Sequence, residues 1–167
     1  PVIVKAHASH LGTNELVATA IINAAKKCDM PDGVFSFIVG EGAVTGMQLV
    51  KHPGVRAVGF TGSYNAGMAI YKAAVNERET SIPVYAEMSS INPVLVLPNK
   101  IAQDIDAVTS QLSASITLGV GQFCTNPGLL FVLRDSNTET FLQKLSQALQ
   151  QVLPATMLNQ TICGAYY

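Results

Sequence analysis

The stretch Val55-Arg56-Ala57-Val58-Gly59-Phe60-Thr61-Gly62-Ser63 runs from an apolar segment into a glycine turn, and a helix is expected from Ser63 to Val75. The same alternation continues along the chain. We expect further strands at residues 2–4, 34–40, 84–87, 93–97 and 129–133, and further helices at residues 13–27, 43–51, 101–118 and 138–152. These strands lack a polar face, which is typical of a parallel sheet covered on both sides. The sequence therefore predicts an α/β fold with helices on both faces of a parallel sheet.

The predicted sheet is of the open, Rossmann-like kind, in which ligands bind beyond the carboxyl ends of the strands. Gly40, Gly62 and Glu87 all fall at such ends. The composition changes at Ser89-Ser90-Ile91-Asn92-Pro93, which predicts a domain boundary between residues 1–88 and residues 89–167.

The overall composition limits the kinds of partner. Of the 167 residues, 49% are hydrophobic and only 13% are charged, whereas average domains carry about a quarter charged residues. We therefore expect a homo-oligomer subunit or a segment of a longer polypeptide, and the start at Pro1 rather than Met favours the segment. A net charge of −1 argues against nucleic-acid or anionic-membrane partners. Three irregularly spaced cysteines make neither a disulfide framework nor a zinc site, so no metal and a reducing cytoplasm are expected.

Two residues could carry covalent chemistry. Cys124 lies in the run Gly119-Val120-Gly121-Gln122-Phe123-Cys124-Thr125-Asn126-Pro127-Gly128, where small neighbours allow a substrate to reach the thiol. Glu87 follows an apolar strand, where loss of hydration would suit a general base. The alternatives are a small buried core thiol at Cys124 and a strand-end carboxylate at Glu87 that pairs with a lysine or arginine.

These runs, together with Ala86-Glu87-Met88-Ser89-Ser90-Ile91-Asn92-Pro93, closely resemble the aldehyde dehydrogenase superfamily, in particular its 2-oxoglutarate-semialdehyde and fatty-aldehyde branch. The similarity runs the whole length of the chain, in the family's order. Members are much longer than this chain, so the resemblance implies the end of the dinucleotide-binding domain at residues 1–88 and the first part of the catalytic domain at residues 89–167. Many members have Glu-Leu-Gly-Gly-Lys where this chain has two serines and no lysine.

The resemblance implies an NAD(P)-dependent oxidation of an aldehyde to a carboxylic acid. Cys124 would be the nucleophile that forms a thiohemiacetal and then a thioester, and Glu87 would activate the water that hydrolyses it. One oxyanion donor and one cofactor ligand of the family lie outside these residues, so the segment alone is expected to be inactive. Two alternatives stay open: a CoA-acylating aldehyde dehydrogenase, and a nucleotide-binding protein without catalysis.

The cofactor residues fall into two groups. By resemblance, Ser63 begins the helix that faces the pyrophosphate, Thr61 and Gly62 lie near the nicotinamide, and the backbone of Met88 contacts that ring. Phe60 belongs to the same run.

The second group lies nearer the start of the chain. The glycines of Gly40-x-Gly42-x-x-x-Gly46 would let the backbone approach the dinucleotide, although this spacing is one residue longer than the usual motif. The resemblance places Lys5 at the adenosine ribose. Ala8 stands where an acid would repel a 2′-phosphate, and His7 lies nearby, so we expect NADP in preference to NAD.

Overall fold

The computed structural model describes residues 1–167, which form two compact units, Pro1–Met88 and Ser89–Tyr167. The boundary falls at the composition change. That the first unit binds a dinucleotide and the second carries catalysis stays a prediction at this point.

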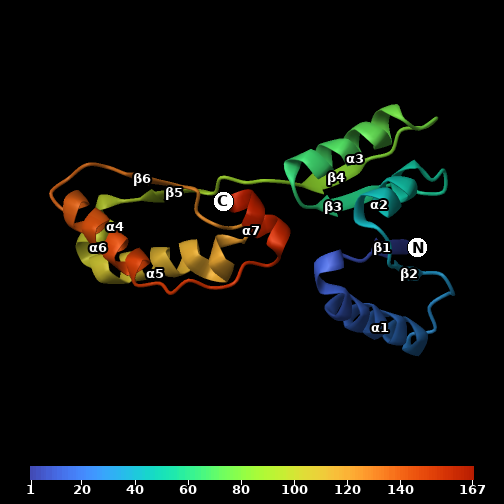
Figure 1. Cartoon of the computed structure of the whole chain (residues 1–167), viewed down its shortest axis with the longest axis horizontal. Helices are drawn as coiled ribbons and strands as arrows, with labels where there is room; N and C mark the ends of the chain where they lie inside the picture. The colour runs from blue at the N-terminus through green and yellow to red at the C-terminus, as the bar shows by residue number, and fades with distance from the viewer. The chain divides into compact units, whose positions relative to one another are not determined.

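The first unit alternates strands and helices in chain order (Figure 1). Its elements are β1 (Val2–Lys5), the 3-10 turn η1 (Ala8–His10), α1 (Leu11–Lys27), β2 (Phe35–Ile38), α2 (Gly42–Lys51), β3 (Val58–Thr61), α3 (Tyr64–Asn76) and β4 (Val84–Glu87). β1 pairs with β2 and β3 pairs with β4, each in parallel. Helices α2 and α3 pack against the β3–β4 pair around a core of Val50, Ala73, Ala74 and Ile82. Because the strands alternate, Val58 and Val84 contact this core, whereas Gly59 and Tyr85 are exposed.

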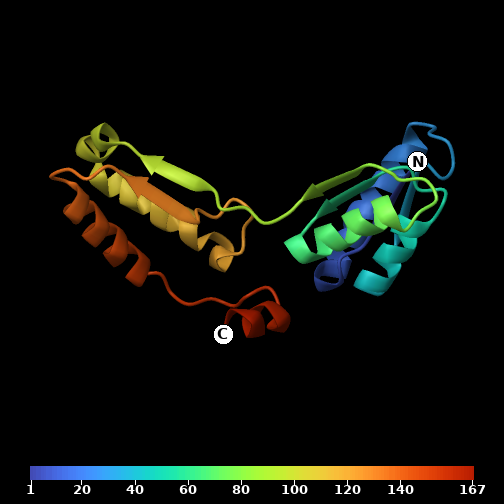
Figure 2. The same ribbon diagram turned by 90° about the horizontal axis from the view of Figure 1, so that it is seen from above.

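The second unit is built on one more parallel pair. Its elements are β5 (Pro93–Val96), α4 (Pro98–Gln103), α5 (Ile105–Thr117), the 3-10 turn η2 (Leu118–Gly121), β6 (Leu129–Val132), α6 (Thr138–Gln150) and α7 (Gln160–Tyr166). Helices α5 and α6 lie on one side of the β5–β6 pair (Figure 2), and Phe141 of α6 is fully buried between them and the strands. On the other side of the pair, the side chains of Leu95 and Phe131 are exposed to solvent, with 70% and 53% of their surface accessible.

The predicted parallel α/β architecture is confirmed, with one difference in its extent. The strands form three two-stranded sheets instead of one continuous sheet, and α5 and α6 cover a single face of the third. Apolar side chains such as Leu95 follow the pattern for a sheet covered on both sides, but no residue of the second unit packs over that face.

Two helix predictions were wrong in detail. The single helix expected at residues 101–118 is divided into α4 and α5 at Asp104, whose carboxylate accepts a hydrogen bond from the N–H of Ala107 at 2.9 Å and caps the second helix. The helix expected from residue 13 begins at Leu11, and α7 was not predicted at all. The remaining bounds agree to within a few residues.

Candidate active site

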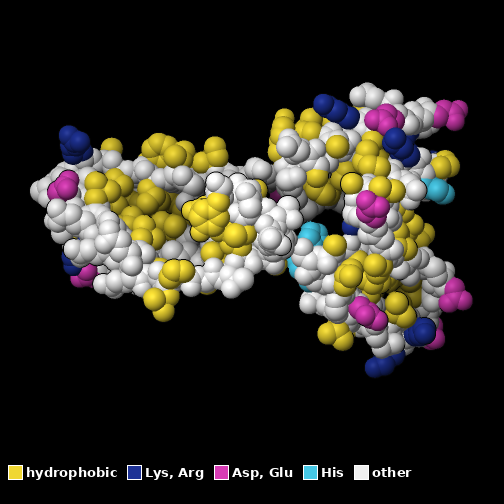
Figure 3. All heavy atoms as spheres, viewed as in Figure 1, with side chains coloured by type: hydrophobic (Ala, Val, Ile, Leu, Met, Phe, Trp, Pro, Cys, Tyr) yellow, Lys and Arg dark blue, Asp and Glu magenta, His cyan; other side chains and the backbone are white.

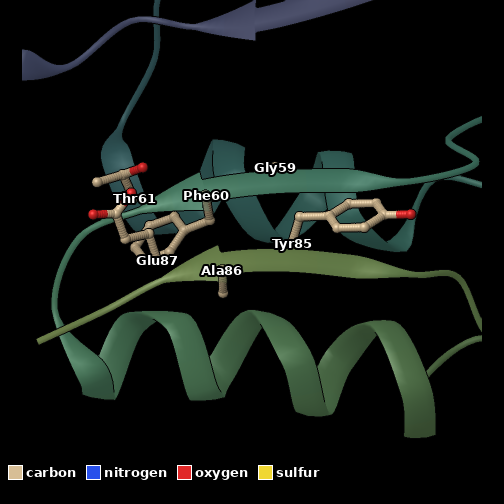
Figure 4. Close-up of a pocket in the computed structure, with 6 residues that line it drawn as sticks. All are labelled: Gly59, Phe60, Thr61, Tyr85, Ala86 and Glu87. Atoms are coloured by element: carbon tan, nitrogen blue, oxygen red, sulfur yellow. The ribbon is translucent and has the colours of Figure 1, made fainter.

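The carboxyl ends of β3 and β4 bring several predicted residues together. Thr61 and Glu87 are register partners at the last position of this strand pair, and the N–H of Gly62 donates to the carbonyl oxygen of Glu87 at 3.0 Å. A pocket lies along the pair, lined by Gly59, Phe60, Thr61, Tyr85, Ala86 and Glu87. Figure 4 shows Thr61 and Glu87 together at one end of this pocket, while Ala86 points toward the helix below.

Glu87 itself is solvent-exposed, and its carboxylate forms no ion pair. The alternative of a carboxylate paired with a lysine or arginine therefore does not describe Glu87 in this structure. The predicted loss of hydration does not describe it either, because the face of the strand pair on which it lies is open. The carboxylate is therefore accessible to water and to a ligand.

The turn after β3 presents the amino end of α3. Ser63 is its N-cap: the Oγ atom accepts a hydrogen bond from the N–H of Ala66 at 3.3 Å. The first turn of this 13-residue helix contains no acidic residue. The N–H groups and the helix dipole therefore offer a site for a negatively charged group.

Close packing explains two glycines beside that turn. A Cβ atom at Gly62 would lie 2.6 Å from Cζ of Phe60, and one at Gly67 would lie 2.5 Å from Sδ of Met88. The side chains of Phe60 and Met88 therefore lie close to the start of α3. The predicted group of Phe60, Thr61, Gly62, Ser63 and Met88 is thus gathered at one end of one strand pair, and its contact with a dinucleotide stays a prediction.

The second predicted group lies at the carboxyl ends of β1 and β2. Lys5 pairs in register with Ile38, and its ammonium donates to the carbonyl oxygen of Ala6 at 2.6 Å. His7 caps η1 by accepting the N–H of Ser9, its ring lies 4.8 Å from that of His10, and Ala8 is the first residue of the turn.

The glycines after β2 differ in what they contact. A Cβ atom at Gly40 would lie 2.3 Å from Oγ1 of Thr45, so close packing requires glycine there. Gly42 and Gly46 lie in α2 with nothing within 4 Å of a Cβ position, so close backbone approach at these two stays a prediction. Sequence reasoning missed Glu41, the exposed N-cap residue of α2, which lies three residues beyond Ile38 at the same edge.

Cys124 lies in the second unit, on the loop between η2 and β6, and its side chain is exposed. This exposure rules out a buried core thiol. The backbone before it is unusual: Gly119, Val120 and Gly121 have φ values of 58°, 61° and 75°. Positive φ is costly for a β-branched residue such as Val120, so the loop holds a strained turn just before the thiol.

Side-chain amides hold this loop in place, and sequence reasoning did not find them. The amide of Asn92 donates to the carbonyl oxygens of Cys124 and Asn126, at 2.6 and 3.0 Å. Asn126 donates in turn to the carbonyl oxygen of Ile116 at 2.6 Å. Gln122 donates to the carbonyl oxygen of Gly119 and accepts the N–H of Leu158, each at 3.0 Å. The only signal in the sequence is a high density of Asn, Gln and Gly in this segment.

The other two cysteines were predicted to be small buried core thiols, and neither is fully buried. Cys28 is the exposed C-cap of α1, and Cys163 lies half-buried in α7. Cys124 is therefore the one cysteine that lies on the glycine-rich loop.

Figure 3 shows hydrophobic side chains on the visible face of both units. The exposed hydrophobic residues of the chain include Tyr85 and Leu95. None of the helices combines the length and the apolar character that crossing a bilayer requires.

Comparison with known proteins identifies the family. The model of the aldehyde dehydrogenase family matches residues 2–166. Alpha-ketoglutaric semialdehyde dehydrogenase 2 of Azospirillum brasilense is 53% identical over 99% of this chain, and alpha-ketoglutaric semialdehyde dehydrogenase of Acinetobacter baylyi is 41% identical over 99%. The chain spans 31% of the length of each.

Solved structures agree on the fold. The NAD-dependent aldehyde dehydrogenase of Sinorhizobium meliloti superposes with a TM-score of 0.79 at 23% identity, covering 96% of this chain and 32% of its own. This likeness speaks for the fold alone. Taken with the family match over nearly every residue, it leads to one conclusion: the chain belongs to the aldehyde dehydrogenase family.

Proposed function

We propose that the whole protein oxidises an aldehyde to a carboxylic acid with NAD(P), through a thioester on Cys124. The observation that carries this proposal is the exposed Cys124 thiol on a glycine-rich loop that side-chain amides hold in place, in a chain of the aldehyde dehydrogenase family. A thiol displayed in this way can be reached by a carbonyl compound, and the strained backbone beside it is typical of functional loops.

The chemistry follows from the two predicted catalytic residues. The Cys124 thiolate attacks the aldehyde carbon, a carbon–sulfur bond forms, and the carbonyl electron pair moves to oxygen. Loss of a hydride from this adduct gives the thioester, and a bound NAD(P) would supply the hydride acceptor. The Glu87 carboxylate then takes a proton from water, the water oxygen attacks the thioester carbon, and the carbon–sulfur bond breaks to release the acid and the thiolate.

The turn after β3 is the proposed site for the cofactor pyrophosphate. Its support is the Ser63-capped amino end of α3, which has no acidic residue in its first turn and lies beside Gly62. Thr61 and the backbone of Met88 would contact the nicotinamide half, and Phe60 lines the same pocket as Thr61. Lys5, His7 and Ala8 would meet the adenosine half, with Gly42 and Gly46 beneath it.

The preference for NADP over NAD stays a proposal, and the structure adds one argument against it. Lys5 donates to its own neighbour's carbonyl, and Glu41 follows β2 at the same edge. A carboxylate near the adenosine ribose favours the 2′-hydroxyl of NAD over the 2′-phosphate of NADP. Whether the charge of Lys5 or that of Glu41 decides the preference between NADP and NAD can therefore be tested directly.

The proposed substrate is a semialdehyde that bears a carboxylate. Its support is the identity of 53% and 41% with two proteins named alpha-ketoglutaric semialdehyde dehydrogenases. We further propose that the protein forms a homo-oligomer and that residues 1–167 alone turn over no aldehyde. The exposed apolar side chains on the open face of the β5–β6 pair support the need for further contacts.

A product assay tests this function against its two alternatives. The whole protein is incubated with 2-oxoglutarate semialdehyde and NADP or NAD, with and without CoA, and the carboxylic acid, acyl-CoA and reduced cofactor are measured. Formation of acid without CoA is the expected result. Acyl-CoA as the product would favour the CoA-acylating alternative, whereas cofactor binding without any turnover would favour the non-catalytic one.

A further inference from the structure

The amide of Asn92 is the one side chain whose hydrogen bond reaches the backbone of Cys124 itself. Its Nδ2 atom lies 2.6 Å from the Cys124 carbonyl oxygen and 3.0 Å from the Asn126 carbonyl oxygen. The two hydrogens of one amide group thus bridge the residues on either side of Thr125. The bond joins residues 32 positions apart, so it ties the start of β5 to the loop before β6.

The orientation of this amide is fixed from both sides. The hydroxyl of Ser90 donates to the Oδ1 atom of Asn92 at 2.8 Å, which leaves the NH₂ group facing the loop. The backbone of Asn92 has a φ of 47°, a left-handed conformation that asparagine and glycine tolerate better than other residues. Both features suit Asn92 to present its amide in one direction.

Other hydrogen bonds also support the loop, namely those of the Gln122 and Asn126 side chains and one from the Asn126 N–H to the Phe123 carbonyl oxygen at 3.1 Å, but none of them reaches the backbone of Cys124. Cys124 and its neighbours Phe123 and Thr125 are all exposed, so no core packing holds them. The three positive φ values at residues 119–121 mean that the loop starts from a strained turn that would relax if it were released. A hydrogen bond to the carbonyl of Cys124 therefore does much to define the direction of its backbone.

We propose that Asn92 is a positioning residue for the nucleophile: by holding the Cys124 carbonyl, it fixes the backbone from which the thiol and the Cys124 N–H project. This inference rests on the proposed function, in which Cys124 forms the thioester. Ser90 acts one step further out, by orienting the Asn92 amide. Small displacements of a reacting group slow a reaction by up to about 100-fold, so loss of this bond should reduce the rate of acylation.

Three variants of the whole protein distinguish the effect of the Asn92 side-chain amide from that of its left-handed backbone conformation, and a fourth is a control. Asn92→Asp keeps the shape but replaces the donor with a carboxylate that faces two carbonyl oxygens. Asn92→Gly keeps the left-handed backbone and deletes the amide. Ser90→Ala leaves Asn92 in place but frees its orientation. Gln150→Ala removes an exposed amide at the end of α6 and serves as the matched control.

The measurement is the pre-steady-state acylation of the enzyme by p-nitrophenyl acetate, which transfers its acetyl group to a thiolate and releases p-nitrophenolate without any cofactor. The burst amplitude counts folded sites with a competent thiol, and the burst rate constant reports how well each one is positioned. For Asn92→Asp and Asn92→Gly we expect a rate constant about 10- to 100-fold lower, with at least most of the amplitude kept. For Ser90→Ala we expect a smaller reduction, and for Gln150→Ala none.

Two results would overturn the inference. One is a rate constant within about twofold of the wild type in both Asn92 variants. The other is a loss of amplitude alone, since that would mean that Asn92 supports folding and nothing more. If Asn92→Asp does not fold, Asn92→Gly and Ser90→Ala decide the question by the same criterion. Cys124→Ala is measured in parallel: a burst that persists there would overturn the proposed function, not the role of Asn92 in holding the loop.

Discussion

The N–H of Gly62 donates a hydrogen bond to the carbonyl oxygen of Glu87, with 3.0 Å between nitrogen and oxygen. This bond extends the β3–β4 ladder by one residue, so the turn that leads into α3 and the predicted base share one rigid strand pair. The proposed base and the proposed cofactor turn are therefore linked by a backbone hydrogen bond.

Replacing Gly62 with alanine should weaken cofactor binding. The new Cβ atom would lie 2.6 Å from Cζ of Phe60, so the aromatic ring must move out of the pocket end that it shares with Thr61. Overpacking of this kind costs about 1–3 kcal/mol, and we expect Kd for NADP and NAD to rise about tenfold. Titration of each cofactor by fluorescence, with thermal unfolding beside it, measures both effects.

Gly67→Ala is the matched comparison, since its Cβ atom would meet the flexible side chain of Met88 at 2.5 Å. Met88 can give way, and alanine favours the helix by up to about 1 kcal/mol. Its Tm should therefore stay the same or rise. An equal loss of cofactor affinity in both variants would contradict the account of the turn.

Glu87→Gln should separate the two halves of the proposed reaction. The amide cannot accept the proton of the attacking water, so the acyl-enzyme should accumulate while the first turnover still occurs. We expect a burst of reduced cofactor close to the wild-type amplitude and a steady-state kcat at least about 100-fold lower. Intact-protein mass spectrometry should detect the added acyl group. A steady-state rate equal to that of the wild type would remove Glu87 from the mechanism.

Val120→Gly should stabilise the second unit. Val120 has a φ of 61° and is 36% exposed, so glycine relieves strain of about 1–3 kcal/mol, which outweighs the loss of a partly covered side chain. The gain is reduced by the greater freedom of glycine in the unfolded chain, which leaves a net stabilisation of about 1 kcal/mol. Chemical unfolding compares it with Val120→Ile, which keeps a β-branched residue and should bring no gain. A lower stability of the glycine variant would show that the turn is not strained.

Glu41→Gln tests how the cofactor is selected. Removing the negative charge beside the ends of β1 and β2 should lower Kd for NADP relative to NAD by about fivefold, because the 2′-phosphate no longer meets a carboxylate. The ratio of the two dissociation constants is the measured quantity. Glu15→Gln, in the first half of α1, is the control and should leave the ratio unchanged. An unchanged ratio in Glu41→Gln as well would mean that Glu41 is remote from the ribose.

The strands and the turn before α3 could be predicted from the sequence, because they depend on neighbouring residues in the chain. Apolar runs and the turns between them predicted the strands, and β4 has the predicted bounds of residues 84–87. The turn at Gly62 and Ser63 was predicted from the type of residues that end a strand and begin a helix. The helix break was missed because it depends on the side-chain geometry of Asp104, which residue preference alone does not reveal.

The support of the Cys124 loop could not be predicted, because it depends on contacts that are distant in the sequence. Asn92 reaches Cys124 over 32 positions, and Gln122 accepts the N–H of Leu158 over 36. Such bonds follow only from the folded arrangement of β5, β6 and the segment before α7. The roles of Cys124 and Glu87 stay predictions, for which the fold and the family provide the setting.

The most direct test of the central claim is a single-turnover experiment on the whole protein, in which Cys124→Ala is compared with Cys28→Ala. Enzyme in excess is mixed with 2-oxoglutarate semialdehyde and NADP or NAD, and reduced cofactor is followed together with the mass of the protein. If Cys124 is the nucleophile, a full burst and an acyl adduct on Cys124 are expected in the wild type and in Cys28→Ala, and neither in Cys124→Ala. A burst of unchanged amplitude in Cys124→Ala would contradict that role, because the thiol would then not be the group that receives the acyl chain.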